Sequence, residues 1–199
     1  MENKLLSIDA AIKYAGKEKE ILSQKSEAVI DFDDDLHELV SRMASTMYFY
    51  EAVGISAVQI GIHKSLFIVR VDTDKYATFI NPEIVQESEE KENIVEGCLS
   101  FPGISIPVER SKEVILKFQE KDGTEKEVQV GGLHARIILH EMDHLKGKTF
   151  LDRISVLKRN VILDKMKRIE RNGKLIRDRQ VINYLENTVK NENANTESR

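Results

Sequence analysis

The spacing of apolar residues predicts two helices that frame the chain. In residues 33–50, apolar side chains recur every three or four positions, and Asp33 or Asp34 can cap the first turn. A second and more apolar helix is predicted for residues 132–146, GLHARIILHEMDHLK, which Gly147 then ends. Few charged side chains interrupt this second helix, so it is expected to be buried.

Short runs rich in β-branched residues predict strands between the two helices. The runs cover residues 66–71, 77–85, 104–108, 113–118 and 125–130. Asp122-Gly123 is typical of a hairpin turn, and Pro82 indicates an edge or a break in the second run. Residues 52–61 and 86–93 are predicted to be loops. The order of helix, strands and helix favours an α+β fold with mostly antiparallel sheets packed around the second helix.

Composition limits the classes of protein to which the chain can belong. Its 199 residues suit one domain with an appended tail, and its net charge of −4 argues against non-specific nucleic-acid binding by the whole molecule. Cys98 is the single cysteine, so no internal disulfide can form and a reducing compartment is favoured. The N-terminus does not resemble a signal peptide, and no apolar run approaches 18 residues. These features predict a soluble cytoplasmic protein without a membrane partner.

The sequence His140-Glu141-Met142-Asp143-His144 carries the strongest chemical signal. Positions four apart lie on the same helix face, so His140 and His144 can hold one metal ion together. Glu141 stands beside the first histidine, where it can handle the proton of an activated water. The predicted central helix is therefore a metal-binding helix. Two core histidines that happen to be four apart are the alternative, which the glutamate disfavours.

Two histidines leave a catalytic metal ion short of one protein ligand. Cys98, in the stretch Glu96-Gly97-Cys98-Leu99-Ser100, is the candidate for the third position. A buried structural thiol and a nucleophilic cysteine are the alternatives, and the residues alone do not decide among the three. A ligand set of one sulfur and two nitrogens suits zinc.

Three motifs, taken together, resemble the peptide deformylase family. They are AVGISAVQIG at residues 52–61, EGCLS at 96–100 and HEMDH at 140–144, in the order in which the family carries them. The resemblance runs from about residue 20 to residue 165. It implies a hydrolase of protein biosynthesis that removes the formyl group from N-formylmethionyl nascent peptides and releases formate. It also implies one divalent metal ion, Fe²⁺ in the cell, with Zn²⁺, Ni²⁺ or Co²⁺ able to take its place.

The resemblance also implies a role for individual residues. The metal ligands are Cys98, His140 and His144. Glu141 is the acid and base, and Gln59 with the backbone N–H of Leu99 stabilises the oxyanion. Gly54 belongs to the wall along which the substrate backbone lies, near an exposed strand edge. Candidates for the methionine pocket are Val53, Leu99, Leu133 and Ile137, for which an ordinary place in the core is the open alternative. Apart from the resemblance, Glu96 can pair with Arg110 to brace the cysteine loop and Asp143 can brace the site, with ordinary surface charges as the open alternative for both.

The C-terminal part of the chain has a different character. Residues 157–169 keep helical spacing, and residues 158–179 hold nine Lys or Arg against three acids, an excess of +6. A solvated basic face is one reading, and a docking surface for the RNA of the ribosome is the other. The sequence thus predicts a catalytic domain at 1–157, a C-terminal helical extension at 158–190 and a disordered tail at 191–199.

Two other functions share part of this pattern. A metalloprotease also carries HExxH, but it usually takes its third ligand downstream, and EGCLS with Gln59 speaks against it. A non-catalytic binding protein on the same scaffold would not need the complete set of catalytic residues.

Overall fold

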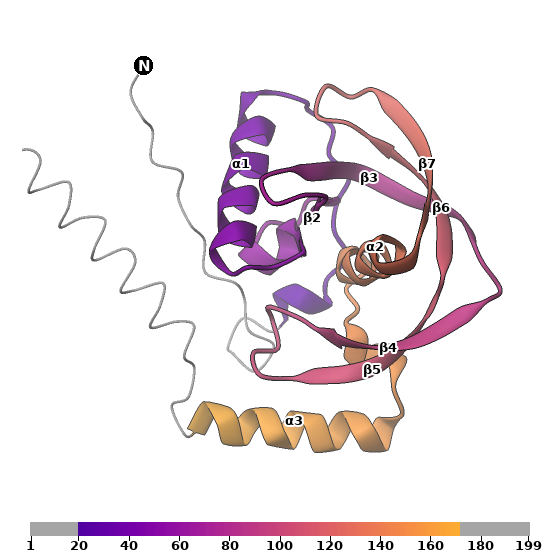
Figure 1. The fold of residues 1–199 in the computed structure, drawn as a ribbon. Coiled ribbons are helices and arrows are strands. Elements are labelled where there is room, and N and C mark those ends of the chain that lie inside the picture. Colours follow the sequence, from indigo (N-terminus) through magenta and orange to yellow (C-terminus); the bar gives the residue numbers. More distant parts are fainter. Residues whose placement is uncertain (1–19, 172–199) are drawn as a thin grey trace, which may run out of the picture.

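The computed structural model of the protein describes residues 20–171 (Figure 1). A five-stranded antiparallel sheet in the order β1-β2-β3-β6-β7 and a two-stranded sheet, β4-β5, enclose the helix α2. The strands are β1 Gly54–Ser56, β2 Leu66–Arg70, β3 Tyr76–Glu87, β4 Lys91–Gly97, β5 Ser105–Ser111, β6 Glu113–Gln119 and β7 Glu125–Gly131. The α-helices are α1 Asp34–Phe49, α2 Gly132–Leu145 and α3 Val156–Arg171. Short 3₁₀ helices lie at η1 Ile21–Ser23, η2 Ala57–Ile60 and η3 Phe150–Arg153. The predicted α+β class, with its central helix and its helices on either side in sequence, is confirmed.

The first helix forms as its pattern predicts. The Asp33 side chain accepts a hydrogen bond from the Leu36 amide at 3.0 Å, which satisfies one of the unpaired N–H groups of the first turn. Asp34 and Asp35 lie in that turn, where the helix dipole favours negative charge. The buried residues of the helix, among them Val40 and Met47, pack on one face of the larger sheet.

Strand β2 is buried on both faces, which explains its unbroken apolar sequence. Leu66 and Ile68 point toward α1 and join its apolar cluster. Phe67 and Val69 point to the other face and join the cluster around α2. The larger sheet therefore separates two cores and supports α2 from one side.

Two predicted loops contain strands, and these predictions are wrong. Residues 52–61 include β1, whose three residues pair with β2, and then η2. Residues 86–93 include the end of β3 and the start of β4. A three-residue strand is too short to show alternation. Strand β4 lacks it because six of its seven residues are exposed, so its stability comes from pairing with β5 along its whole length.

The end of α2 is defined by a close contact between chain segments. Gly147 has φ of +67°, and a Cβ atom there would lie 2.5 Å from the Ser23 carbonyl oxygen. The Ser26 amide donates to the carbonyl of Leu145 at 2.9 Å. Glycine is required at this position because an N-terminal segment crosses the end of the helix.

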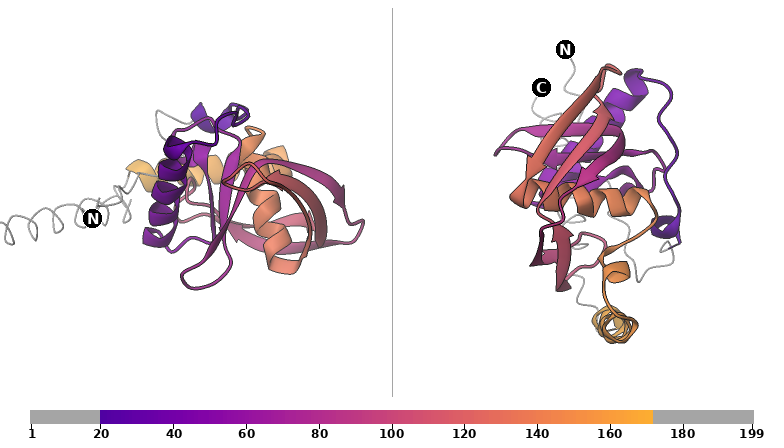
Figure 2. Two further views of the ribbon diagram at one scale, coloured as in Figure 1. Left: turned by 90° about the horizontal axis from the view of Figure 1, so that it is seen from above. Right: turned by 90° about the vertical axis from the view of Figure 1, so that its right-hand side faces the viewer.

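The last described helix, α3, lies below the β4-β5 sheet and is seen end-on in the right-hand view of Figure 2. Met166 and Ile162 connect it to an apolar cluster that contains Phe101, Phe150 and Leu151. Residues 172–190 of the predicted C-terminal helical extension, and the predicted tail at 191–199, lie outside the described residues. Among residues 20–171, no helix combines the length and hydropathy that crossing a bilayer requires.

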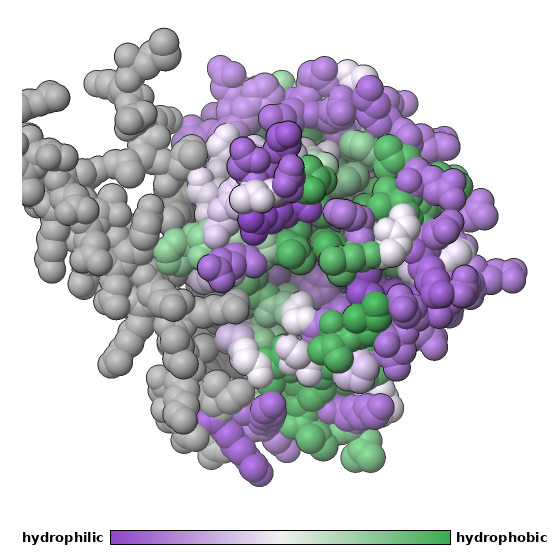
Figure 3. All heavy atoms as spheres, viewed as in Figure 1, coloured by the Kyte–Doolittle hydropathy of each residue, from purple (hydrophilic) through white to green (hydrophobic). Residues whose placement is uncertain are grey.

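Large exposed apolar side chains occur in two places in particular. One group, Val53, Val95 and Leu133, lies around a cleft beside α2, and the other, Val156, Leu157 and Val161, lies on α3. On the face shown in Figure 3, hydrophobic residues gather across the middle and lower part, with a hydrophilic border above and to the right.

Candidate metal centre and substrate cleft

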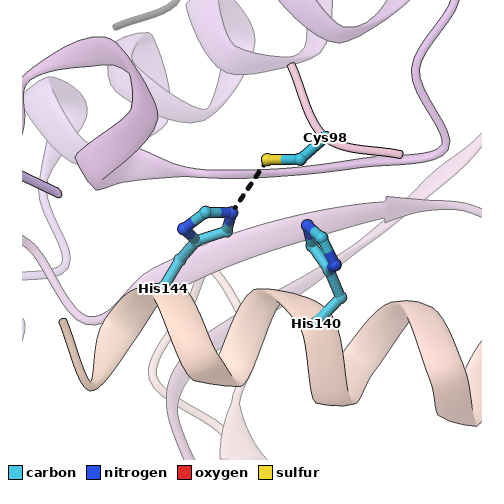
Figure 4. Close-up of side chains that lie close together, drawn as sticks. All are labelled: Cys98, His140 and His144. Atoms are coloured by element: carbon cyan, nitrogen blue, oxygen red, sulfur yellow. Dashed lines mark hydrogen bonds between the residues drawn. The ribbon is translucent and has the colours of Figure 1, made fainter. Parts of the chain in front are cut away.

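The two histidines of α2 form the base of the site. His140 and His144 are separated by one turn, and their ring centroids lie 5.1 Å apart. Both side chains are buried and point to the same side of the helix (Figure 4). This placement follows from the local sequence, because any helix over these residues would bring the two rings together.

Cys98 comes to the histidines from a different part of the fold. It follows directly after β4, and its Sγ lies 3.3 Å from Nε2 of His144 (Figure 4). One donor atom from each of Cys98, His140 and His144 lies within 4.8 Å of the other two. One thiol and two imidazoles converging in this way match the three protein ligands of a catalytic divalent metal.

Glu141 lies beside this cluster in a tight space. Its side chain is buried, and its Oε2 has no hydrogen-bond partner among the described residues. Burial raises the pKa of Glu141 to about 7, despite the opposing effects of the His140 charge and of the nearby Ser56 hydroxyl. A Cβ atom at Gly54 would lie 2.8 Å from Glu141 Oε1 and 2.9 Å from Ile137 Cγ2, so only glycine lets β1 approach the carboxyl group so closely.

Gln59 is held on η2 in a defined orientation. Its Oε1 accepts hydrogen bonds from the Ser56 amide at 3.0 Å and the Ser56 hydroxyl at 3.1 Å. Because a backbone N–H can only donate, the amide oxygen faces Ser56 and the NH₂ group faces the other way. Nε2 lies 3.4 Å from both Cys98 Sγ and the Ser100 hydroxyl. The Gln59 NH₂ group therefore faces Cys98, which with His140 and His144 forms the group of metal donors called here the donor cluster. Ser56 is a supporting residue that the sequence analysis missed.

A buried group of charged side chains surrounds the back of the site. Arg110 makes two bonds to Glu96, at 2.6 and 2.9 Å, and one to Asp143 at 2.9 Å. Arg136 and Arg153 bind the same two carboxylates from either end. The Glu96–Arg110 pair and the contact of Asp143 are present as expected from the sequence, whereas the part of Arg136 was missed.

Charges in this group and the donor cluster shift one another's pKa values. Burial alone would raise the pKa of Glu96, but hydrogen bonds with His140 and Arg110 lower it to about 2. Burial opposes the charged form of His140, yet its contacts with Cys98 and Glu96 raise its pKa to about 10. Burial, followed by the positive charges of His140 and Arg110, lowers the pKa of His144 well below its usual value. A metal ion at these donors would replace the proton that His140 otherwise holds.

A cleft of about 330 Å³ opens beside these groups. Its lining includes every residue expected to contact substrate: Val53, Gly54, Leu99, Leu133 and Ile137. Val53 and Leu133 are exposed at 51% and 62%, while Leu99 and Ile137 are buried, so the four apolar residues span from mouth to floor. Ile94 and Val95 of β4 also line the cleft. They were missed because β4 was not predicted as a strand.

Sequence comparisons show which known proteins this chain resembles. Residues 10–160 match the family model described as polypeptide deformylase. The peptide deformylase of Thermotoga sp. (strain RQ2) is 41% identical over 154 residues, which cover 77% of this chain and 93% of that protein. The peptide deformylase of Natranaerobius thermophilus is 42% identical over 133 residues, 67% of this chain and 85% of that protein.

Solved structures give the same result for the fold. A crystal structure of the peptide deformylase from Ehrlichia chaffeensis in complex with actinonin matches with a TM-score of 0.77 and 33% identity. It covers 83% of this chain and 99% of that one. The peptide deformylase from Legionella pneumophila matches with a TM-score of 0.75 and 34% identity, over 82% of this chain and 98% of that one.

Proposed function

The chain belongs to the polypeptide deformylase family, and from this premise we propose which of its residues hold the metal ion and carry the reaction. The enzyme is a metal-dependent hydrolase that removes the formyl group from the N-terminal methionine of newly made polypeptides and releases formate. The observation that carries the residue assignment is the convergence of Cys98, His140 and His144 within 4.8 Å, beside a cleft that also contains Glu141.

Cys98, His140 and His144 are the ligands of one divalent ion. A thiolate and two imidazoles are suitable donors for Fe²⁺, Zn²⁺, Ni²⁺ and Co²⁺, and membership of the deformylase family favours Fe²⁺ in the cell. When bound, the ion supplies Lewis-acid activation of water and of the formyl carbonyl.

Glu141 and Gln59 have different roles in hydrolysis: Glu141 transfers a proton, and Gln59 stabilises the negative charge on the carbonyl oxygen. With a pKa raised to about 7, Glu141 takes a proton from the attacking water and returns it to the leaving amine. The Gln59 NH₂ group, oriented by Ser56, and the backbone N–H of Leu99 donate to the oxyanion. Each such donor is typically worth roughly 3 kcal/mol.

The formylmethionine side chain occupies the apolar part of the cleft. Val53, Leu99, Leu133 and Ile137 surround it, and the substrate backbone lies along Gly54. Gly54 is at the edge of the larger sheet, because β1 pairs only with β2 among the described strands. An extended peptide can add to such an edge through backbone hydrogen bonds.

Three variants test the roles separately. Glu141→Gln keeps shape and metal but should release formate about a hundredfold or more slower, because it lacks the proton-accepting charge. Cys98→Ser should lose metal first and activity as a consequence. Gln59→Leu should keep metal and lose roughly a hundredfold in kcat. The measurements are metal content per chain and formate release from formyl-Met-Ala-Ser, on protein prepared without oxygen.

The outcomes also separate the alternatives. Full metal occupancy in Cys98→Ser would break the ligand assignment. A cysteine nucleophile would be alkylated by iodoacetamide with or without metal, whereas a ligand should be shielded until a chelator removes the ion. A metalloprotease would cut internal bonds of unformylated peptides, and a binding protein would release no formate.

The enzyme works in the cytoplasm, at the ribosome, where formylated chains emerge. The basic segment 158–179 is the docking surface in this proposal, and Lys158, Lys165 and Arg168 in its described part are exposed. Electrostatic binding to RNA phosphates should weaken with salt.

Charge reversal tests the docking surface in the full-length protein. Lys165→Glu/Arg168→Glu should weaken co-sedimentation with ribosomes at low salt. The matched control, Lys75→Glu/Lys121→Glu, changes the net charge equally at exposed positions away from α3 and should keep binding. Equal binding by both pairs would exclude α3 as the docking surface.

A further inference from the structure

Arg136 is a buried cation one helical turn before His140. It is 5% exposed, and its guanidinium makes three charge-assisted hydrogen bonds across to the smaller sheet. Nη1 donates to Glu96 Oε1 at 2.7 Å and to the Val108 carbonyl at 2.8 Å, and Nη2 donates to the Glu92 carbonyl at 2.6 Å. Removing an arginine from water is costly, so a position that keeps one buried needs such a set of partners.

Glu96 is the point at which Arg136 reaches the donor cluster. Its Oε1 accepts from Arg136 Nη1 and from Arg110 Nε. Its Oε2 lies 2.9 Å from Arg110 Nη2 and 3.0 Å from Nδ1 of His140. A carboxylate offers about four acceptor positions, and all four are used here. The orientation of this carboxylate is therefore determined from three sides.

Arg110 alone does not account for this orientation. Its Nε and Nη2 donate to Glu96, while its Nη1 is shared between Asp143 Oδ2 and the Leu139 carbonyl, so one guanidinium serves both carboxylates at once. Without Arg136, Oε1 of Glu96 and the carbonyls of Glu92 and Val108 would each lose the hydrogen bond that Arg136 donates. Glu96 would then be free to tilt about the remaining arginine, and its contact with His140 would lengthen.

We propose that Arg136 is a positioning residue for the metal ligand His140. By completing the contacts of Glu96, it keeps Oε2 as the acceptor of the His140 Nδ1–H group, which leaves Nε2 of that ring to face the ion. A carboxylate partner of this kind fixes the tautomer and the orientation of a ligating histidine. The proposal rests on the ligand set of the proposed function. Arg136 also lines the cleft, so the same side chain contacts both the proposed substrate site and the carboxylate that binds His140.

The rival explanation is that Arg136 has only a structural role, in which its hydrogen bonds attach α2 to β4 and β5. Loss of a purely structural contact would change the stability of the fold without changing how the ion is held. The distinguishing readouts are therefore the rate at which a chelator removes zinc from the loaded protein, and the absorption spectrum of the cobalt form. Urea unfolding of the same samples reports the structural contribution.

The test compares Arg136→Met with Arg153→Met in the full-length protein. Arg153 also binds a buried carboxylate, Asp143, but makes no hydrogen bond to Glu96, so it is the matched control. Arg136→Met should release zinc about 10- to 100-fold faster and alter the cobalt spectrum, the size typical for loss of a metal ligand's partner. Arg153→Met should release zinc within about threefold of the wild-type rate, although both lower the urea midpoint. Arg136→Lys should fall between Arg136→Met and wild type, because it restores one charged donor.

A double-mutant cycle with Glu96→Gln asks whether Arg136 acts through Glu96. In the Glu96→Gln background, adding Arg136→Met should change the release rate little, because the two residues form one unit. If Arg136→Met does not fold, Arg136→Lys carries the same cycle, with release faster than wild type by about threefold or more.

Wild-type release rates in Arg136→Met or Arg136→Lys, or additive effects in the cycle, would overturn the proposal. Arg136 would then have only a structural role. Failure of the ligand set looks different, because the wild-type chain would then not bind one ion or Cys98→Ser would keep it.

Discussion

One side of α2 packs Ile138, Met142 and Leu145 on the larger sheet, whereas the opposite side buries Arg136 and Asp143 against the smaller one. On the apolar side the contacts are non-directional, and another apolar side chain of similar volume can supply them. On the charged side each group depends on a named partner at a fixed distance. The two sides should therefore respond differently to the loss of a few atoms.

The difference has a functional consequence. The apolar side holds the helix in the fold, and the charged side sets the orientation of one of its proposed metal ligands. Replacing a buried ion pair as a whole can be neutral, but removing one partner leaves the other charge buried and alone. The helix thus combines a tolerant side with a sensitive one, and variants on each side can break or sharpen this contrast.

The largest effect is expected from Arg110→Met. This change removes the cation that Glu96 and Asp143 share, and both carboxylates remain buried. We expect the metal-free protein to lose about 3–5 kcal/mol in its free energy of unfolding, measured with urea. Metal release should accelerate as well, because Glu96 no longer keeps its place beside His140. A loss below about 1 kcal/mol would mean that water or a neighbouring arginine compensates, and that the two sides do not differ as described.

A smaller effect is expected on the apolar side from Ile138→Val. Ile138 is 1% exposed within the cluster, so losing one methylene should lower the free energy of unfolding by about 0.5–1.5 kcal/mol. The rate of zinc release should stay at the wild-type value. If the rate of zinc release rose together with the loss of stability, the positions of the metal ligands would depend on apolar packing rather than on their charged partners.

The smallest effect is expected from an exposed ion pair. Lys117 and Glu127 face each other across β6 and β7 at 3.6 Å, with side chains 62% and 52% exposed. Lys117→Met should change the free energy of unfolding by no more than about 0.5 kcal/mol, because solvent screens the pair. A larger change would show that charge pairs stabilise this protein even outside the buried group, which would weaken the comparison with Arg110.

The elements that the sequence predicted well are those with a clear local period. Strand β2 and the hairpin of β6 and β7 were found through β-branched runs and the Asp122-Gly123 turn. Strands β1 and β4 were missed because one is very short and the other is mostly exposed. Missing β4 also hid Ile94 and Val95 from the cleft. These errors have one cause, since pairing with a partner strand leaves no periodic trace in a short or solvated segment.

By itself the sequence determined that His140 and His144 share one face, because four positions on a helix make little more than one turn. It also determined the chemical types available to the site: one thiol, two imidazoles and a carboxyl group beside them. Only the tertiary structure decided how near Cys98 lies to them and that Glu96 is bound by two arginines from separate elements. Those contacts join residues 14 to 46 positions apart, and their distances depend on how the sheets pack around α2 rather than on any local preference.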